Sequence, residues 1–259
     1  MRTLSVKTPH GDCPVYVFDA KGGVGPGLLL ALDGGGVRPA MFQMAEEMAA
    51  EGFTVIVPDL FYRVGHPFDL LPEGQPKTFA GFFGQVRADP SFRGKAMAVL
   101  GGAGSPDSVR EVFSGVMQLI DEQLLAPKGP VKAGKLGITG YCMGGGVAFR
   151  VGAQFPERIG AVASFHGGNL ATTAPESPHL GVPKLKANVF VAGAVEDNSY
   201  TPEMRDRLVD ALKAAGVKHT VETWDGALHG FSVPDTPVFK PEFGKRHHDS
   251  LLQLLTQSI

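Results

Sequence analysis

Short apolar runs of strand length alternate along the chain with longer stretches in which apolar residues recur at helical spacing. The runs predict strands at Leu28–Asp33, Phe53–Pro58, Leu136–Thr139, Ala161–Phe165, Ala187–Ala192 and His219–Trp224, and helices at Pro39–Glu51, Asp107–Leu125, Met143–Gln154, Pro202–Ala215 and Phe243–Gln257. Strands that alternate with helices form βαβ units, whose strands are parallel. The pattern therefore predicts an α/β fold with a mostly parallel central sheet flanked by helices on both faces.

Two segments interrupt this alternation. Residues 62–106 carry Gly and Pro punctuation and a cluster of phenylalanines, and we interpret them as an excursion over the sheet edge that walls a pocket. Residues 167–184 are rich in Pro, Ser and Thr and predict a long loop, a kind of segment that often carries function. Because strands and helices alternate on both sides of each segment, we expect one domain over residues 1–259.

The composition narrows the classes of function. The chain is 43% hydrophobic and 19% charged, as ordinary globular proteins are. Its 24 basic and 26 acidic residues leave no basic surplus for nucleic acid or an anionic membrane, so a small neutral or anionic substrate fits better. The sequence contains neither an apolar run of spanning length nor the apolar core of a secretory signal. We therefore expect a cytoplasmic protein without nucleic-acid or membrane partners, as a monomer or small homo-oligomer.

The sequence Gly-Tyr-Cys-Met-Gly at residues 140–144 lies between a predicted strand and a predicted helix. It has the form G-x-C-x-G, at the place where α/β-hydrolases carry G-x-S-x-G. A tight turn there lifts the nucleophile above the sheet, and the flanking glycines relieve the crowding of the backbone. The N-terminal amides of the following helix favour a thiolate and a neighbouring oxyanion. Cys142 is therefore predicted to be a nucleophile.

Other interpretations of this turn stay open. Free cysteines are often buried for structural reasons. Glycine-rich turns also bind nucleotides, although neither G-x-G-x-x-G nor the Lys-Ser/Thr ending of a P-loop occurs here. The chain has two cysteines, Cys13 and Cys142, so a redox-sensing role would require these two thiols to meet.

An acid and a base follow the cysteine in the chain order of this fold, which is nucleophile, acid, base. Asp197 comes shortly after the strand Ala187–Ala192, at the sheet edge where α/β proteins place their sites, and Glu196 is its neighbouring alternative. His229 precedes a glycine in the loop after the last predicted strand, which suits a base that must reach the sulfur. Either acid has the alternative of being a solvated loop charge.

The other histidines suit this role less well. We expect His10, His219, His247 and His248 at the surface, whereas His66 and His179 have no matching strand end. His166 ends a strand beside two glycines, which makes it a candidate to line the site, with a structural role as the alternative. Neither H-E-x-x-H nor C-x-x-C occurs, so we predict no metal, and the chemistry below requires no cofactor.

The turn after the strand Leu28–Asp33 contains three successive glycines. Backbone amides in such a turn approach a substrate closely because no side chain intervenes. We predict that the amides of Gly34 and Met143 form an oxyanion hole, with a simple flexible turn as the alternative.

Together these motifs resemble the dienelactone hydrolase family, a branch of the α/β-hydrolases with a cysteine nucleophile. The similar segments are residues 140–145 for the nucleophile motif, residues 191–197 for the acid loop and residues 229–231 for the histidine loop. The resemblance implies the α/β-hydrolase fold and a catalytic triad of Cys142, Asp197 and His229. It also implies that Asp33 stands where the family keeps a carboxylate, usually Glu, that interacts with the nucleophilic thiol.

The resemblance also bears on the substrate. The name-giving substrates of the family are unsaturated lactones with a carboxylate, which the best-known members hold with arginines, one of them shortly after the catalytic histidine. Here Ser232, Val233 and Pro234 follow Phe231, and no arginine is present among them. Arg63 and Arg93 are the remaining candidates to contact an anion, with solvated surface charge as the alternative. Tyr62 and His166 are further candidate substrate contacts.

These observations predict a hydrolase that cleaves an ester or lactone bond of a small molecule through a Cys-His-Asp triad, as carboxymethylenebutenolidases do. One alternative is a general carboxylesterase or thioesterase of the same fold. The other is a non-catalytic member that only binds a small molecule, because a fold does not guarantee a function.

Overall fold

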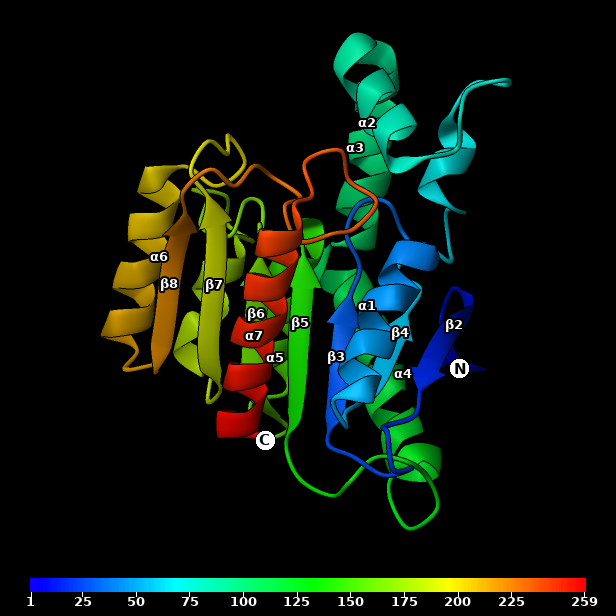
Figure 1. The fold of residues 1–259 in the computed structure, drawn as a ribbon, viewed down its shortest axis with the longest axis vertical. Coiled ribbons are helices and arrows are strands. Elements are labelled where there is room, and N and C mark those ends of the chain that lie inside the picture. Colours follow the sequence, from blue (N-terminus) through cyan, green and yellow to red (C-terminus); the bar gives the residue numbers. More distant parts are fainter.

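The computed structural model describes residues 1–259 and contains one eight-stranded sheet (Figure 1). The strands are β1 (Arg2–Thr8), β2 (Gly11–Phe18), β3 (Gly27–Ala31), β4 (Thr54–Pro58), β5 (Leu136–Tyr141), β6 (Ile159–Phe165), β7 (Asn188–Ala194) and β8 (His219–Trp224). Their order across the sheet is β1-β2-β4-β3-β5-β6-β7-β8. The pairs from β4 to β8 are parallel, whereas β1 and β2 add an antiparallel hairpin at one edge. The predicted mostly parallel α/β fold is confirmed.

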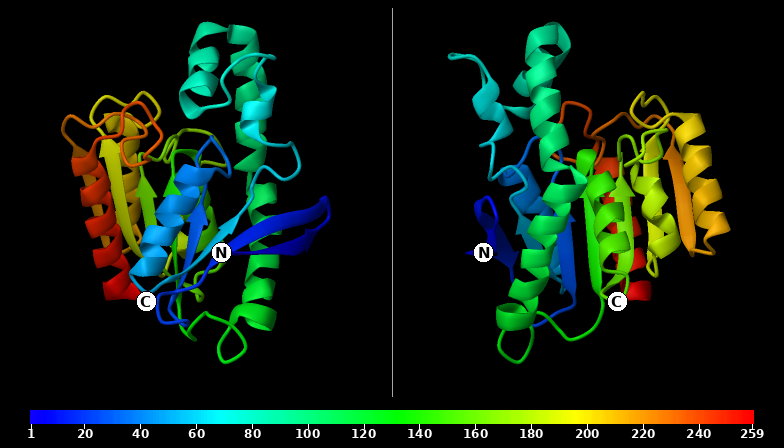
Figure 2. Two further views of the ribbon diagram at one scale, coloured as in Figure 1. Left: turned by 45° about the vertical axis from the view of Figure 1, so that its right-hand side comes forward. Right: turned by 180° about the vertical axis from the view of Figure 1, so that it is seen from behind.

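The helices cover both faces of this sheet. They are α1 (Pro39–Ala50), α2 (Phe79–Ala88), α3 (Pro90–Ala103), α4 (Pro106–Leu119), α5 (Met143–Gln154), α6 (Pro202–Ala214) and α7 (Pro241–Ser258), with short 3₁₀ helices η1 (Pro67–Leu70) and η3 (Pro178–Lys184) and the π-helical turn η2 (Ile120–Leu124). Helices α1 and α7 contribute to the core on one face, and α4, α5 and α6 to the core on the other. Figure 2 shows these two layers in an oblique view and from behind.

Strand β3 shows why the central strands have unbroken apolar sequences. Leu28 and Leu30 face the core under α1 and α7, whereas Leu29 and Ala31 face the core under α4, α5 and α6. Every residue of β3 is therefore buried, since a parallel sheet is covered on both faces. Full burial of one such leucine side chain stabilises the fold by about 1.5–3 kcal/mol.

The N-terminal hairpin was not predicted, because no strand was assigned before Leu28. In the structure β1 and β2 pair from Arg2↔Val17 to Thr8↔Gly11 through a two-residue turn. Gly11 has φ +115°, a backbone conformation that residues with a side chain rarely adopt. The hairpin joins the sheet through β4, with the register Val15↔Pro58 to Phe18↔Val55.

We call residues 67–103 the cap segment. It extends beyond the carboxyl ends of the parallel strands (Figure 1). The segment contains η1, α2 and α3, and it has a small core of its own. That core consists of Phe68, Leu71, Phe82, Val86, Phe92 and Ala96. Two side chains cap its helices: Thr78 Oγ1 accepts from Gly81 N at 3.1 Å, and Asp89 Oδ1 accepts from Ser91 N at 2.8 Å.

No helix of the structure combines the length and the apolar character that crossing a membrane requires.

Candidate active site

Cys142 occupies the turn between β5 and α5, with φ 55° and ψ −119°. A residue with a side chain in such a conformation stores about 1–3 kcal/mol of strain, which the surrounding structure must hold. The flanking glycines explain how the turn closes: a Cβ at Gly140 would lie 1.9 Å from Gly144 O, and a Cβ at Gly144 would lie 2.3 Å from Ala31 O. The motif therefore forms the tight strand-to-helix turn that the sequence predicted.

Asp197 and His229 form a hydrogen-bonded pair at the carboxyl ends of β7 and β8. His229 Nδ1 and Asp197 Oδ2 are 2.7 Å apart, and the aspartate side chain is only 3% exposed. The second carboxylate oxygen, Oδ1, accepts from the backbone N–H of Ser199 at 2.8 Å and from its hydroxyl at 2.6 Å. Both oxygens are thus engaged, so the carboxylate has a fixed orientation toward the imidazole. Ser199 was not predicted as part of this site.

The electrostatics of this pair favour an ion pair. Burial alone would lower the pKa of His229, but the Cys142 thiolate, with its hydrogen bond, and Asp197 outweigh it and raise the pKa well above its usual value. Burial likewise opposes the charge on Asp197, yet hydrogen bonds from His229 and Ser199 leave the pKa of this carboxyl below its usual value. The structure thus brings the three predicted triad residues together, with His229 between a thiol and a carboxylate.

Of the two amides predicted to form an oxyanion hole, that of Met143 belongs to the same turn. Met143 is the first residue of α5, so its N–H has no acceptor within the helix. Gly34 N–H donates none of the hydrogen bonds in the loop backbone, whereas Gly36 N–H donates to Asp33 O at 3.2 Å. A Cβ at Gly34 would lie within 3.3 Å of Leu100 and Phe83. Gly34 therefore faces the side chains that also wall the pocket described next.

A pocket of about 430 Å³ opens over Cys142 and His229. Its other walls include Phe83, Met97, Leu100 and Gly101 of the cap segment, Gly168 and Asn169 of the loop after β6, and Gly146 and Arg150 of α5. The excursion and the long loop that the sequence singled out thus both border the pocket. The lining is polar at Arg150 and mainly apolar along the cap segment.

This geometry can be compared with known proteins. A sequence model described as the dienelactone hydrolase family matches residues 13–259. The chain belongs to the dienelactone hydrolase family.

Two relatives are carboxymethylenebutenolidases by name. The one from Pseudomonas sp. is 25% identical over 236 residues, which cover 90% of this chain and 85% of the relative. The one from Rhodococcus opacus is 24% identical over 244 residues, which cover 93% of this chain and 84% of the relative. Both similarities span the motifs at residues 140–144 and 229–231, since they cover nearly the whole chain.

Solved structures support the fold. One from Klebsiella pneumoniae superposes with a TM-score of 0.75 at 19% identity, covering 99% of this chain and 98% of that chain. A dienelactone hydrolase-like promiscuous phosphotriesterase from metagenomic libraries superposes with a TM-score of 0.67 at 16% identity, covering 99% and 97%. At these identities the likeness establishes the α/β-hydrolase fold and no particular substrate.

Asp33 differs from what the resemblance to the dienelactone hydrolase family implied. Its carboxylate does not contact the thiol, because both oxygens bind the guanidinium of Arg38, at 2.6 and 2.8 Å. Oδ1 also accepts from Gly35 N at 2.8 Å. Arg38 was not singled out in the sequence, and only its side chain's position reveals the pairing.

The residues predicted to contact the substrate lie elsewhere. Tyr62 and Arg63 are bound to each other and to Thr8 and Glu111 at the surface, outside the pocket. Arg93 is exposed on α3 and does not line the pocket either. None of the three lines the pocket, since sequence shows which segment approaches a site but not which of its faces turns inward.

Arg150 is the arginine that does line the pocket. It lies eight residues after Cys142 on α5, with Gly146 between them, so the three follow one face of the helix. Its Nη2 donates to the backbone oxygen of Glu176 at 2.7 Å. Burial lowers the pKa of this guanidinium, which nevertheless stays charged at neutral pH. The i, i+4, i+8 spacing was the signal in the sequence that identifies it.

His166 lies beside His229. Its ring meets that of His229 edge to face at 5.3 Å, and its Nε2 is 3.0 Å from Ser232 Oγ. Burial, together with the neighbouring histidines His229 and His247, lowers the pKa of His166 well below its usual value. It is 1% exposed and does not line the pocket, so its position matches the structural alternative.

Two further expectations need correction or comment. His247 is buried rather than exposed. It lies on the side of α7 that faces the sheet, where its Nε2 pairs with the hydroxyl of Tyr141 on β5 at 2.8 Å. Cys13 is free and fully buried on β2, and no disulfide joins it to Cys142. Nowhere do three His, Cys, Asp or Glu side chains converge as metal ligands would.

Proposed function

We propose that this chain hydrolyses an ester or lactone bond of a small molecule with Cys142 as nucleophile, His229 as acid and base and Asp197 as the residue that orients the histidine. The observation that carries the proposal is the 2.7 Å contact between His229 and Asp197 beside a cysteine held in a strained turn. Strained backbone at such a turn is a feature of nucleophiles that must project from the sheet.

The reaction follows from the positions of these groups. The Cys142 thiolate attacks the carbonyl carbon, a C–S bond forms, and the carbonyl electron pair moves to oxygen. The amides of Gly34 and Met143 hold this oxyanion. When the tetrahedral intermediate collapses, the alkoxide leaves and takes a proton from His229, which leaves a thioester on Cys142.

Water completes the cycle. His229 takes a proton from a water molecule, and the hydroxide attacks the thioester carbonyl through a second oxyanion. Collapse of this intermediate breaks the C–S bond, releases the carboxylic acid and restores the thiolate. Asp197 keeps its negative charge throughout and stabilises the imidazolium in both halves of the reaction.

Substitution of the nucleophile tests this proposal. Cys142→Ala should lower kcat for p-nitrophenyl esters and simple lactones by about 10⁴-fold or more, since the loss of a triad nucleophile leaves only binding and the oxyanion hole. Cys13→Ala is the matched control, because this cysteine is buried away from the pocket, and it should retain wild-type kcat. Ester hydrolysis that persists in Cys142→Ala would refute the proposal.

Reactivity of the thiol gives a second measurement. Iodoacetamide should alkylate Cys142 much faster than an ordinary thiol near neutral pH, with the labelled residue scored by mass spectrometry between pH 5 and 9. His229→Ala should remove this excess, because the imidazolium that supports the thiolate is lost. An ordinary rate that His229→Ala leaves unchanged would argue for a non-catalytic member that only binds small molecules.

A general carboxylesterase or thioesterase is the second candidate. The observation that favours it is the scarcity of cations in the pocket, where Arg150 is the one arginine. A panel of neutral esters, thioesters and carboxylate-bearing lactones separates the two: similar kcat/KM for all of them identifies the general enzyme, and a preference for the anionic lactones identifies the specialised one.

A further inference from the structure

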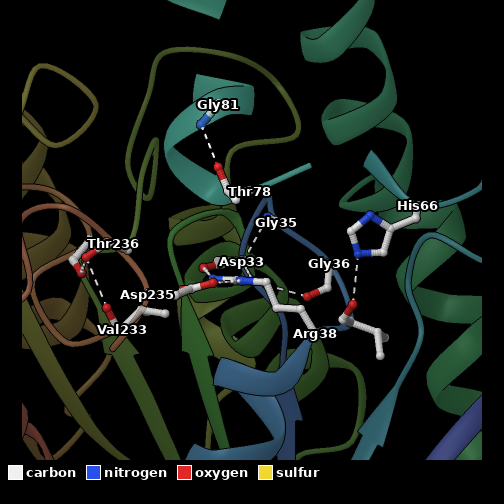
Figure 3. Close-up of polar contacts among 12 residues, drawn as sticks. Asp33, Gly35, Gly36, Arg38, His66, Thr78, Gly81, Val233, Asp235 and Thr236 are labelled. Atoms are coloured by element: carbon white, nitrogen blue, oxygen red, sulfur yellow. Dashed lines mark hydrogen bonds and ion pairs between the residues drawn. The ribbon is translucent and has the colours of Figure 1, made fainter. Parts of the chain in front are cut away.

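The guanidinium of Arg38 uses every one of its hydrogen-bond donors. Nε and Nη2 donate to the two oxygens of Asp235 at 2.7 and 3.0 Å, and Nη1 and Nη2 donate to those of Asp33 at 2.6 and 2.8 Å. The fifth bond runs from Nη1 to Gly36 O at 3.1 Å. Arginine has five N–H donors, so none is left for solvent or substrate. Figure 3 shows the guanidinium between the two aspartates.

This group is also enclosed on its flat face. The side chain of Arg38 is 5% exposed, and its guanidinium lies 5.1 Å from the centre of the Phe79 ring in the cap segment. Burial opposes the positive charge, but the carboxylates of Asp33 and Asp235 outweigh it and raise the pKa of Arg38. The guanidinium is therefore charged, buried and fully paired, whereas a salt bridge at the surface would be mobile.

The network closes the loop Asp33–Gly36 from both ends. Asp33 Oδ1 accepts from Gly35 N, and Asp33 O accepts from Gly36 N, while Arg38 binds the carboxylate of Asp33 and the carbonyl of Gly36. Of the three glycine amides in this loop, the two that follow Gly34 are therefore engaged. The amide of Gly34 donates no backbone hydrogen bond, and a Cβ built on this residue would meet Phe83 and Leu100 of the pocket wall.

We propose that Arg38 is a positioning residue, which fixes this loop so that the Gly34 N–H points to the oxyanion formed at Cys142. The inference rests on the hydrolytic function proposed above and adds a residue to it. Arg38 touches neither substrate nor thiol, and it acts through the loop alone. An isolated Asp33-Gly-Gly-Gly run has no such order, since glycine leaves the backbone free to rotate.

The histidine loop is joined to Arg38 through Asp235, but it also has contacts of its own near His229. Thr236 Oγ1 donates to Gly230 O at 2.9 Å and to Val233 O at 3.0 Å, contacts that Figure 3 shows in part. His229 itself is oriented by Asp197 at 2.7 Å. Removal of the guanidinium should therefore disturb the Gly34 amide more than the pairing of His229 with Cys142.

Two reactions of the same thiol distinguish these roles. Ester hydrolysis passes through an oxyanion, but alkylation by iodoacetamide is a direct displacement of iodide that forms none. In Arg38→Met, kcat for p-nitrophenyl esters should fall on the order of 100-fold, which is the usual effect of losing one oxyanion donor, with KM within about two-fold. The alkylation rate of Cys142 should stay within about two-fold of wild type. Arg38→Lys should rescue only part of kcat, because lysine has three donors and no planar fork.

The matched control is Arg158→Met. Arg158 binds Asp121 through two hydrogen bonds of 3.0 and 2.8 Å, so this variant also removes a two-pronged Arg–Asp contact, but one remote from the pocket. It should leave both rates at wild-type values. Hydrolysis and alkylation that fall together in Arg38→Met would overturn the proposal, as would unchanged hydrolysis.

Two further measurements keep the proposal testable if Arg38→Met does not fold or if the wild-type chain hydrolyses no ester. Asp235→Asn weakens the more exposed half of the network, at a carboxylate that is 36% exposed, and should lower kcat several-fold without changing alkylation. A trifluoromethyl ketone, which the thiolate converts to a hemithioketal oxyanion, should bind wild type at least ten-fold more tightly than either variant. Equal binding of the ketone to wild type and variants would refute the role of Arg38. Absence of ester hydrolysis by the wild type would by itself refute only the proposed function.

Discussion

The sheet body and the cap segment meet at the pocket, yet they are built differently. The body buries 38 core residues on one face of the sheet and 27 on the other, whereas the cap segment has a cluster of six. The residues proposed for chemistry, among them Cys142 and His229, belong to the body, and the cap segment supplies Phe83, Met97 and Leu100 as an apolar wall.

This difference suggests that the two regions contribute differently to catalysis and to substrate binding. A large core holds reacting groups within the small tolerances that catalysis needs. A small cluster opens at low free-energy cost and can adapt to different substrates. We therefore expect most changes in the body to act on kcat and on global stability, and changes in the cap segment to act on KM and on the range of substrates. Arg150, a residue of the body that lines the pocket, is the exception.

The largest effect is expected at Asp197. Asp197→Asn should lower kcat for ester hydrolysis by about 10⁴-fold, because the amide no longer holds His229 in the tautomer that accepts a proton. Steady-state kinetics with a p-nitrophenyl ester measure this change. Asp225→Asn, at an exposed position of the loop after β8, is the matched control and should behave as wild type. A loss below ten-fold in Asp197→Asn would mean that this carboxylate does not orient the base.

Two buried phenylalanines compare the stability of the body and the cap segment. Phe149→Ala, in the larger core, should lower the free energy of unfolding by about 3–5 kcal/mol. Phe82→Ala, in the cluster of six, should lower it less and should instead raise KM, since it loosens the pocket wall. Urea unfolding followed by circular dichroism, with hydrogen exchange of α2 and α3, tests both. Equal losses of global stability would show that the two regions unfold as one.

A smaller effect is expected at Arg150. Arg150→Met should raise KM about ten-fold for esters that carry an anionic group, and should leave KM for neutral esters unchanged, because one charge-assisted hydrogen bond is lost. Arg93→Met is the control, since this arginine lies outside the pocket. The same shift for neutral and anionic esters would assign Arg150 a structural role instead.

The smallest effects are expected in the protonation of His229 and His166, whose rings lie against each other, and NMR titration can measure the pKa of each. At pH 6.5 an ordinary histidine is about half protonated. His229, whose pKa is raised, should be mostly protonated there, and its protonation should be lost only as the pH rises well above 6.5. His166, whose pKa is lowered, should stay neutral throughout this range.

Cys142→Ala provides the check on the cause. Removal of the thiolate charge should lower the pKa of His229, because Cys142 is the strongest influence that raises it. The shift of His166 should change little, since burial dominates it. A pKa of His229 that is unaffected by the substitution would mean that sulfur and imidazole are not coupled.

The sequence predicted the central sheet and the motif residues because both depend on local patterns. The strands from β3 to β7 are mainly apolar runs covered on both faces, and the turn at Cys142 needs glycines at fixed positions that can be read directly. The N-terminal hairpin was not predicted because β1 is an edge strand with mostly exposed residues. In addition, only a short turn separates β1 from β2.

The contacts around the pocket depend on residues far apart in sequence. Arg38 and Asp235 are separated by 197 positions, and His247 meets Tyr141 across 106. No spacing rule links such pairs, because their meeting depends on how α1, α7 and the loop after β8 pack. For the same reason Arg63 and Arg93 were predicted to contact the substrate from the approach of their segment, although neither side chain lines the pocket.

The burial of Cys13 makes the chain a convenient target for site-specific labelling. Its thiol is fully enclosed, and burial raises its pKa to about 12, so it is neither accessible nor ionised at neutral pH. A maleimide or chloroacetamide that couples to the folded chain therefore does so at Cys142, with a stoichiometry of one. A fluorophore or an affinity handle can thus be installed at the pocket of the unaltered protein, without first engineering a cysteine-free background.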